Sequence, residues 1–142
     1  MSSPCWWTNK SSLSALEEGG IPVIDRGERG LTGVEAVIDK DFASALLARQ
    51  LHADLLLLLP DVDAVYLNYG APGARAIRRA NPVTLSREIF AAGSMGPKIA
   101  AATEFAIETG HLAGIGQLAD ALAIARGERG TWIDIAVPPS SF

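Results

Sequence analysis

The chain has 142 residues, the length of one ordinary domain, and 49% of them are hydrophobic, enough for a buried core. Its net charge of -4 excludes a general attraction to nucleic acid or to an anionic membrane surface, so neither is expected as a partner. The single cysteine excludes an internal disulfide, and two histidines far apart in sequence offer no metal-ligand spacing, so no metal site is predicted.

The N-terminal part of the chain differs from the rest in its sequence pattern. Residues 1–18 show no periodicity and place Trp6 beside Trp7, so an irregular N-terminal arm is expected. The arm shows no signal-peptide pattern, and no apolar run in the chain approaches the roughly 18 residues of a membrane helix. A soluble, cytoplasmic protein is therefore expected. Residues 20–24 predict a short strand, and the glycine-rich residues 25–33 predict a surface loop or a small hairpin.

A helix is predicted over residues 39–51, with Asp39 as its N-cap. Phe42, Ala45 and Leu46 share one face of this helix. The leucine run over 54–59 favours a strand buried in a parallel sheet. After this strand come an acidic and aromatic segment over 61–69 and a solvated loop over 70–82. Further helices are predicted over 84–90, 97–109 and 118–126, the last with Leu118, Ala121, Leu122 and Ala125 inward. Further strands are predicted over 112–116 and 131–135, the last at a sheet edge, and a tail follows over 137–142.

Strands and helices thus alternate along the chain, which predicts an α/β fold with a mostly parallel sheet and helices on both faces. The predicted domain spans residues 19–136. In open sheets of this kind ligands bind at the carboxyl ends of the strands, which is where the segment over 61–69 begins.

Two helix starts carry a lysine in or near the first turn: Asp39-Lys40-Asp41, and Lys98 at the end of the Gly93–Lys98 segment. Backbone N–H groups and lysines at helix starts suit phosphate, and phosphoryl transfer depends on such positive groups aimed at the transferred phosphoryl. Ordinary charged helix caps are the alternative interpretation. Neither a P-loop nor a dinucleotide-binding fingerprint is present.

Four segments in series resemble the C-terminal half of the carbamate kinases, which belong to the amino-acid kinase superfamily. They cover residues 33–41, 43–48, 61–66 and 92–98, within a resemblance that runs from about Gly19 to Ile133. The resemblance implies that Lys40 and Lys98 contact ATP phosphates and that Asp41 organises these lysines. It also implies ATP or ADP with Mg²⁺ as cofactor, and these further nucleotide-binding residues: Asp39, Asp61, Asp63, Tyr66, Met95 and Gly96.

The family's N-terminal half, with its glycine-rich phosphate loop, another active-site lysine and most of the carbamate pocket, has no counterpart here. One hypothesis is a carbamate kinase-like phosphotransferase, in which this chain supplies the ATP/ADP-binding half and carbamate or carbamoyl phosphate binds only with a complementary half. The alternative is a truncated, non-catalytic nucleotide-binding or relic module. A third hypothesis is that the chain belongs to another acid kinase of the superfamily. Self-association is also expected, through an exposed sheet edge and flank or through Trp6 and Trp7.

Overall fold

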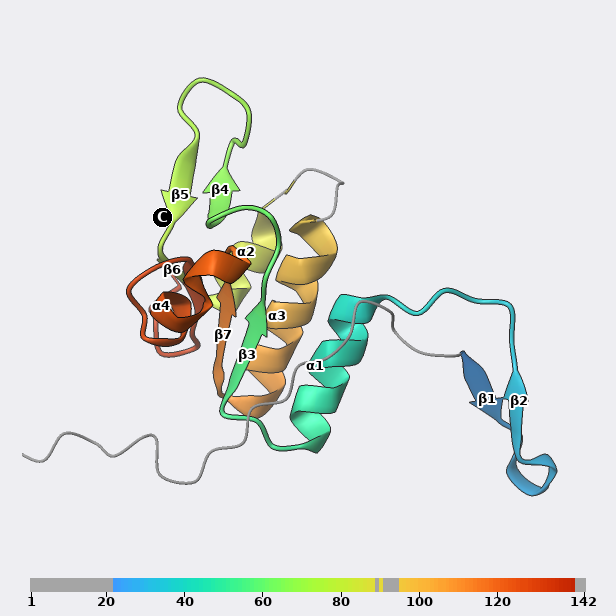
Figure 1. The fold of residues 1–142 in the computed structure, drawn as a ribbon. Helices are drawn as coiled ribbons and strands as arrows, with labels where there is room; N and C mark the ends of the chain where they lie inside the picture. The colour runs from blue at the N-terminus through green and yellow to red at the C-terminus, as the bar shows by residue number, and fades with distance from the viewer. Residues whose placement is uncertain (1–21, 89, 91–94, 140–142) are drawn as a thin grey trace, which may run out of the picture.

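The computed structural model describes residues 22–88, 90 and 95–139 (Figure 1). The expected arm over 1–18, with Trp6 and Trp7, lies outside these residues, as do Gly93 and Ser94 of the second lysine motif. In the described part of the chain, no helix combines the length and the apolar character needed to cross a membrane.

A four-stranded sheet forms the centre of the fold, in the order β3 (Leu55–Leu58), β7 (Leu112–Ile115), β8 (Thr131–Ile133) and β6 (Arg79–Ala80). β3 pairs with β7 in parallel, and β6 pairs with β8 in parallel, whereas β7 and β8 are antiparallel. The mostly parallel sheet is therefore confirmed, with one antiparallel pair inside it.

The predicted position of the last strand is wrong. β8 lies between two neighbours, and all three of its residues are buried. The edge position is taken by the two-residue strand β6, which comes from the end of the segment predicted as a solvated loop over 70–82. Tertiary pairing, which no periodicity in the loop could indicate, places this short strand.

Helices cover both faces of the sheet. The main core lies between the sheet and three helices, α1 (Lys40–Gln50), α2 (Pro82–Arg87) and α3 (Met95–Thr109). On the other face lies α4 (Ala121–Ala125), preceded by the 3-10 turn η2 (Leu118–Asp120). Alternation along β7 explains this division, because Ala113 and Ile115 join the main core while Gly114 faces Ile124 of α4.

The inward positions predicted for Leu118 and Leu122 of the fourth helix are wrong, whereas Ala121 and Ala125 are half-buried. Leu118 and Leu122 are 72% and 54% exposed, whereas Ile124 is fully buried. The 3-10 turn shortens the α-helix to five residues, so the expected α-helical face does not form. Ile124 packs instead where Gly114 and Gly116 have no side chain: a Cβ on either glycine would lie 2.7–2.8 Å from it.

Two antiparallel hairpins lie outside the central sheet. β1 (Val23–Asp25) and β2 (Leu31–Gly33) are joined through the 3-10 turn η1 (Gly27–Arg29), and every residue of both strands is exposed. The small hairpin expected here is present, but the first predicted strand is not part of the parallel sheet. The second hairpin pairs β4 (Val65–Leu67) with β5 (Arg75–Ile77), in a part of the chain where the sequence analysis expects no strand.

The chain direction determines which end of the fold holds the helix N-termini and the loops after the parallel strands. Figure 1 shows the N-terminal ends of α1 and α3 at the same end of the molecule as the carboxyl ends of β3 and β7. The loop that follows β3 leaves from this end. Helix N-termini and the loops after parallel strands are where open α/β sheets bind ligands.

Candidate functional site

The start of α1 is fixed by its cap. The Asp39 Oδ1 oxygen accepts hydrogen bonds from the backbone N–H groups of Asp41 at 2.8 Å and Phe42 at 3.3 Å. The predicted N-cap is therefore confirmed. Lys40 is the first helical residue and is exposed, with its carbonyl accepting a hydrogen bond from the Ser44 hydroxyl.

Asp41 and Lys98 form an ion pair between the first turns of α1 and α3. The Lys98 Nζ atom donates to Asp41 Oδ2 at 2.8 Å and to Oδ1 at 3.1 Å, and the two side chains are only 12% and 11% exposed. The small residues Ala45 and Ala48 continue the buried face of α1, which lets it pack closely on α3. The resemblance implied that Asp41 organises the lysines, and in the structure Asp41 pairs with Lys98.

This pair leaves bonding capacity for a ligand. A lysine ammonium has three N–H donors, and two of them point at the Asp41 carboxylate. Within residues 22–88, 90 and 95–139 the third donor has no hydrogen-bond partner, so it can serve an oxygen of an anion at the N-terminal end of α3. Backbone N–H groups of the first helical turn favour an anion at the same place.

α3 begins earlier than predicted. Its first residue is Met95, so Met95, Gly96 and Pro97 all lie in the first turn, where a proline is tolerated because its missing N–H has no intrahelical partner to lose. Met95 is partly buried and packs against the core. Its predicted place in a nucleoside pocket, together with that of Gly96, stays a prediction.

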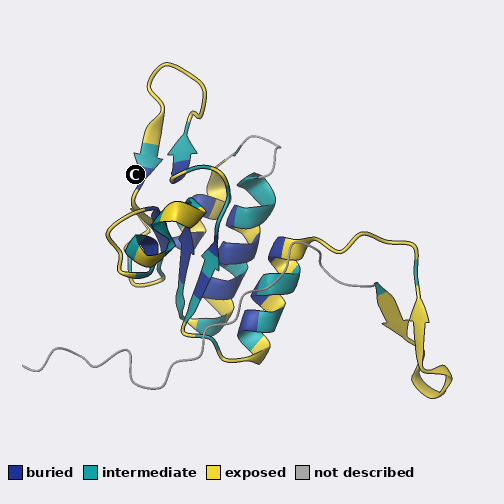
Figure 2. Ribbon diagram, in the orientation of Figure 1, coloured by how far each residue is buried: buried dark blue, intermediate teal, exposed yellow. Residues whose placement is uncertain are grey.

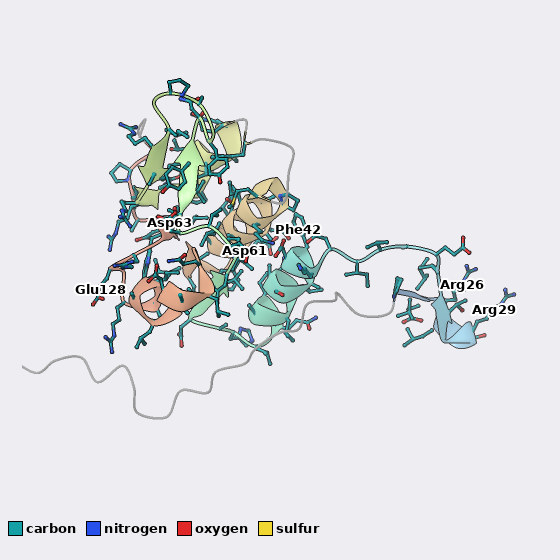
Figure 3. All side chains as sticks on the ribbon, turned by 45° about the horizontal axis from the view of Figure 1, so that its top comes forward. Arg26, Arg29, Phe42, Asp61, Asp63 and Glu128 are labelled. Carbon is teal, nitrogen blue, oxygen red and sulfur yellow. The ribbon has the colours of Figure 1, made fainter. Side chains whose placement is uncertain are left out.

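The loop after β3 carries two acidic residues, Asp61 and Asp63 (Figure 3), and the β4–β5 hairpin that follows it carries two tyrosines. Asp61 and Asp63 are both exposed, and the Tyr66 hydroxyl donates to the Asp63 carboxylate at 3.0 Å and 3.2 Å. The Tyr69 ring meets the Tyr66 ring edge-on, with centroids 5.9 Å apart. The hydrogen bond to Asp63 is the main reason that the pKa of Tyr66 is raised above 10.0, because ionising the hydroxyl would end its donation to the carboxylate.

The structure therefore joins the predicted site residues in two pairs, Asp41 with Lys98 and Asp63 with Tyr66. The roles of Asp39, Lys40 and Asp61 toward a nucleotide stay predictions. Across the described ranges, no group of three or more His, Cys, Asp or Glu side chains could hold a metal ion.

Two residues that the sequence reasoning did not single out support the loop that carries Asp63. The buried Thr131 hydroxyl accepts from the Val65 backbone N–H at 2.8 Å and donates to the Ile77 carbonyl at 2.6 Å, which ties both strands of the second hairpin to β8. Gly116 lets the Asp63 carbonyl approach, since a Cβ at this position would lie 2.8 Å from that oxygen. Only the glycine could have been suspected from sequence.

Comparison with known proteins identifies the family. Residues 9–115 match the model described as "Amino acid kinase family". The chain belongs to the amino acid kinase family. Two curated relatives of this family member are carbamate kinases, one from Rhizobium meliloti at 56% identity over 81% of the chain and one from Haemophilus influenzae at 46% identity over 90%. The resemblance to carbamate kinase drawn from the four sequence segments is thereby confirmed.

Solved structures agree with the fold. A carbamate kinase from Giardia lamblia bound to AMP-PNP aligns with a TM-score of 0.76 and 41% identity over 82% of this chain. A UMP kinase from Bacillus anthracis, at 15% identity and a TM-score of 0.54, shares the fold. The α/β fold of the amino-acid kinase type is thus confirmed.

This amino acid kinase family member spans about two fifths of the length of the relatives it matches. It covers 36% of the Rhizobium meliloti carbamate kinase, 42% of the Haemophilus influenzae carbamate kinase and 42% of the Giardia lamblia structure. The predicted boundaries at residues 18 and 136 stay predictions.

Proposed function

We propose that this chain provides the ATP- and ADP-binding part of a carbamate kinase-like phosphotransferase. The reaction is ATP plus carbamate giving ADP plus carbamoyl phosphate, in either direction. The observation that carries the proposal is the Asp41–Lys98 pair at the common end of α1 and α3. The 41% identity to a carbamate kinase bound to AMP-PNP supports nucleotide binding by this fold.

In this proposal the protein contributes charge and position. The bond from the γ-phosphorus to the oxygen bridging to the β-phosphate breaks, and a bond from that phosphorus to a carbamate oxygen forms. Negative charge on the transferred group is stabilised by the third N–H of Lys98 and by Lys40. Asp41 keeps the Lys98 ammonium in place before the nucleotide binds, which lowers the cost of ordering that side chain.

Magnesium enters this scheme with the nucleotide. In the part of the chain that is described there is no metal cage of protein ligands, and both Asp41 oxygens already face Lys98. Mg²⁺ in phosphoryl-transfer sites is held largely by the substrate's phosphates and by water, so an ion carried by ATP fits these residues. No step of the scheme is assigned to the ion.

The alternative proposal is a nucleotide-binding module without turnover. The chain corresponds to about two fifths of its relatives, and phosphoryl transfer requires both substrates to be positioned. We propose that carbamate or carbamoyl phosphate binds only when a complementary lobe is present. A cytoplasmic location and self-association through Trp6 and Trp7 stay predictions.

One experiment distinguishes these functions. ADP is titrated into the chain by calorimetry, and ATP formation from ADP and carbamoyl phosphate is followed in a coupled assay. Turnover by the chain alone selects the complete kinase, and binding without turnover selects the nucleotide-binding part. If no ADP binds, the nucleotide site itself is refuted.

The lysine assignment has its own test. Lys98→Ala removes the ammonium that would face the phosphates, so we expect the Kd for ADP to rise about tenfold, equivalent to about 1.4 kcal/mol. Arg126→Ala is the matched control, because Arg126 is an exposed cation at the end of α4, and its Kd should stay within about twofold of wild type. Unchanged affinity in Lys98→Ala would remove Lys98 from the site.

A further inference from the structure

Thr131 brings a hydroxyl group into the apolar interior of the molecule. The residue is fully buried, and it begins β8, where it faces Ile115 of β7 in the sheet register. A valine has nearly the same shape as a threonine, and strand pairing uses backbone groups alone. The hydroxyl is therefore what distinguishes threonine from an apolar residue at this position.

This hydroxyl joins both strands of the β4–β5 hairpin to β8. It accepts a hydrogen bond from the Val65 backbone N–H at 2.8 Å and donates one to the Ile77 carbonyl at 2.6 Å. Val65 and Ile77 face each other in the hairpin register, at the base of the hairpin, opposite its connecting loop. Because these two residues are 0% and 3% exposed, their backbone groups could not turn to water if the hydroxyl were removed.

The segment from Asp63 to Val65 is held at both of its ends. At one end the Asp63 carbonyl lies against Gly116, where a Cβ would be 2.8 Å from the oxygen. At the other end the Val65 N–H bonds to Thr131. Ala64, between them, is only 1% exposed. The backbone that carries the Asp63 side chain is therefore tightly packed on both sides.

The next residue along β4 is Tyr66, whose hydroxyl donates to the Asp63 carboxylate. Neighbouring residues of a strand point to opposite faces, so Tyr66 points away from the core that contains Val65. Figure 2 shows the hairpin changing from buried at its base to exposed toward its connecting loop. Contacts at the buried base therefore determine how the exposed part is presented.

We propose that Thr131 is a positioning residue for nucleotide binding. Its hydroxyl fixes the base of the β4–β5 hairpin and thereby sets the orientation of Asp63 and Tyr66, which are predicted to bind the nucleotide. Because Thr131 is fully buried, it acts through the hairpin and not by touching the ligand. The inference rests on the proposed function for the identity of that ligand, ATP or ADP.

Thr131→Val provides the decisive variant, since it keeps the shape of the side chain and removes the hydroxyl. ADP is titrated into the full chain by calorimetry, and we expect the Kd for ADP to rise at least about fivefold. Thr131→Ser restores the hydroxyl and should keep the Kd within about twofold of wild type. Thr131→Cys has a weaker donor and should give an intermediate Kd, and it replaces Thr131→Val if that variant does not fold.

A control separates positioning from a general loss of stability. Leu85→Ala leaves a cavity in the main core, because Leu85 is fully buried, and it lies on α2, which carries none of the predicted site residues. We expect this variant to unfold at lower urea concentration than wild type and to keep its Kd for ADP within about twofold. All titrations are made under conditions where urea denaturation shows every variant to be folded.

A second readout uses no nucleotide. In a Tyr69→Phe background Tyr66 is the only tyrosine, so the titration of phenolate absorbance reports its hydrogen bond to Asp63. Thr131→Val should move this midpoint toward the ordinary pKa of 10.0, whereas Thr131→Ser and Leu85→Ala should leave it in place. If the wild-type chain binds no ADP but shows this pattern, the proposed function is refuted and the positioning role of Thr131 is retained.

Other results would overturn the proposal. An unchanged Kd in Thr131→Val would show that the hydroxyl does not influence the nucleotide. If Thr131→Ser binds ADP as weakly as Thr131→Val, the hydroxyl is not the cause. Equal weakening by Leu85→Ala would reduce the effect to lost stability. A weaker Kd in Thr131→Val with the wild-type Tyr66 midpoint would show that the effect does not pass through Asp63 and Tyr66.

Discussion

At the scale of single residues, the candidate site consists of side chains that hold one another. Asp41 fixes Lys98 through two hydrogen bonds, and Asp63 accepts from Tyr66. The mostly buried Asp41–Lys98 pair matters more for chemistry than for stability. Breaking such a pair by removing one partner is costly, but the intact pair contributes little net free energy because both charges are desolvated.

The Asp63–Tyr66 hydrogen bond predicts a shifted titration. In a Tyr69→Phe background Tyr66 is the only tyrosine, and its phenolate absorbance should appear above the ordinary pKa of about 10. Asp63→Ala removes the carboxylate that accepts the Tyr66 hydrogen bond, so the pKa should fall back toward 10. A raised pKa stabilises the folded state below the unfolded-state pKa, and this stabilisation disappears as pH rises through the folded-state pKa. The same midpoint in both variants would refute the assigned cause.

At the scale of elements, glycines determine how α4 and the loop after β3 meet the sheet. Gly114 and Gly116 on and after β7 leave room for Ile124, and Gly116 also makes room for the Asp63 carbonyl. The loop is held a second time by Thr131, whose hydroxyl bridges Val65 and Ile77. The position of the Asp63 loop therefore depends on Thr131 in β8 and on the glycine that follows β7.

Gly116→Ala tests this dependence. Its new methyl group would lie 2.7 Å from Ile124 Cδ1 and 2.8 Å from the Asp63 carbonyl oxygen, so the structure must shift. We expect a loss of about 1–3 kcal/mol in the free energy of unfolding, measured by urea denaturation. Gly33→Ala is the control, since a Cβ there meets nothing within 4 Å, and its change should stay below about 1 kcal/mol. Equal changes in both variants would contradict this packing.

At the scale of the whole molecule, the core and the N-terminal hairpin differ in how far their residues are buried. The core cluster joins α1, α2 and α3 to the sheet, with Phe105 and Ile115 fully buried. The β1–β2 hairpin has all its strand residues exposed. Regions with few buried apolar contacts open at lower free energy than the core does.

Hydrogen exchange should show this difference directly. The backbone amides of β1 and β2 are expected to open at a free energy at least about 2 kcal/mol below that of the β7 amides. The β7 amides serve as the internal control, because β7 is paired on both sides. Comparable protection in the hairpin and in β7 would show that the hairpin is already covered in solution.

The sequence by itself determined the family and the α/β alternation. Each of these depends on local signals: a capping aspartate, an apolar run of strand length, and four motifs in series. Tertiary structure alone decided that β8 is central, that Ile124 and not Leu122 is buried, and that Thr131 supports the loop. These outcomes depend on which strands pair and which glycines leave space, and long-range contacts of this kind leave no periodic trace in one sequence.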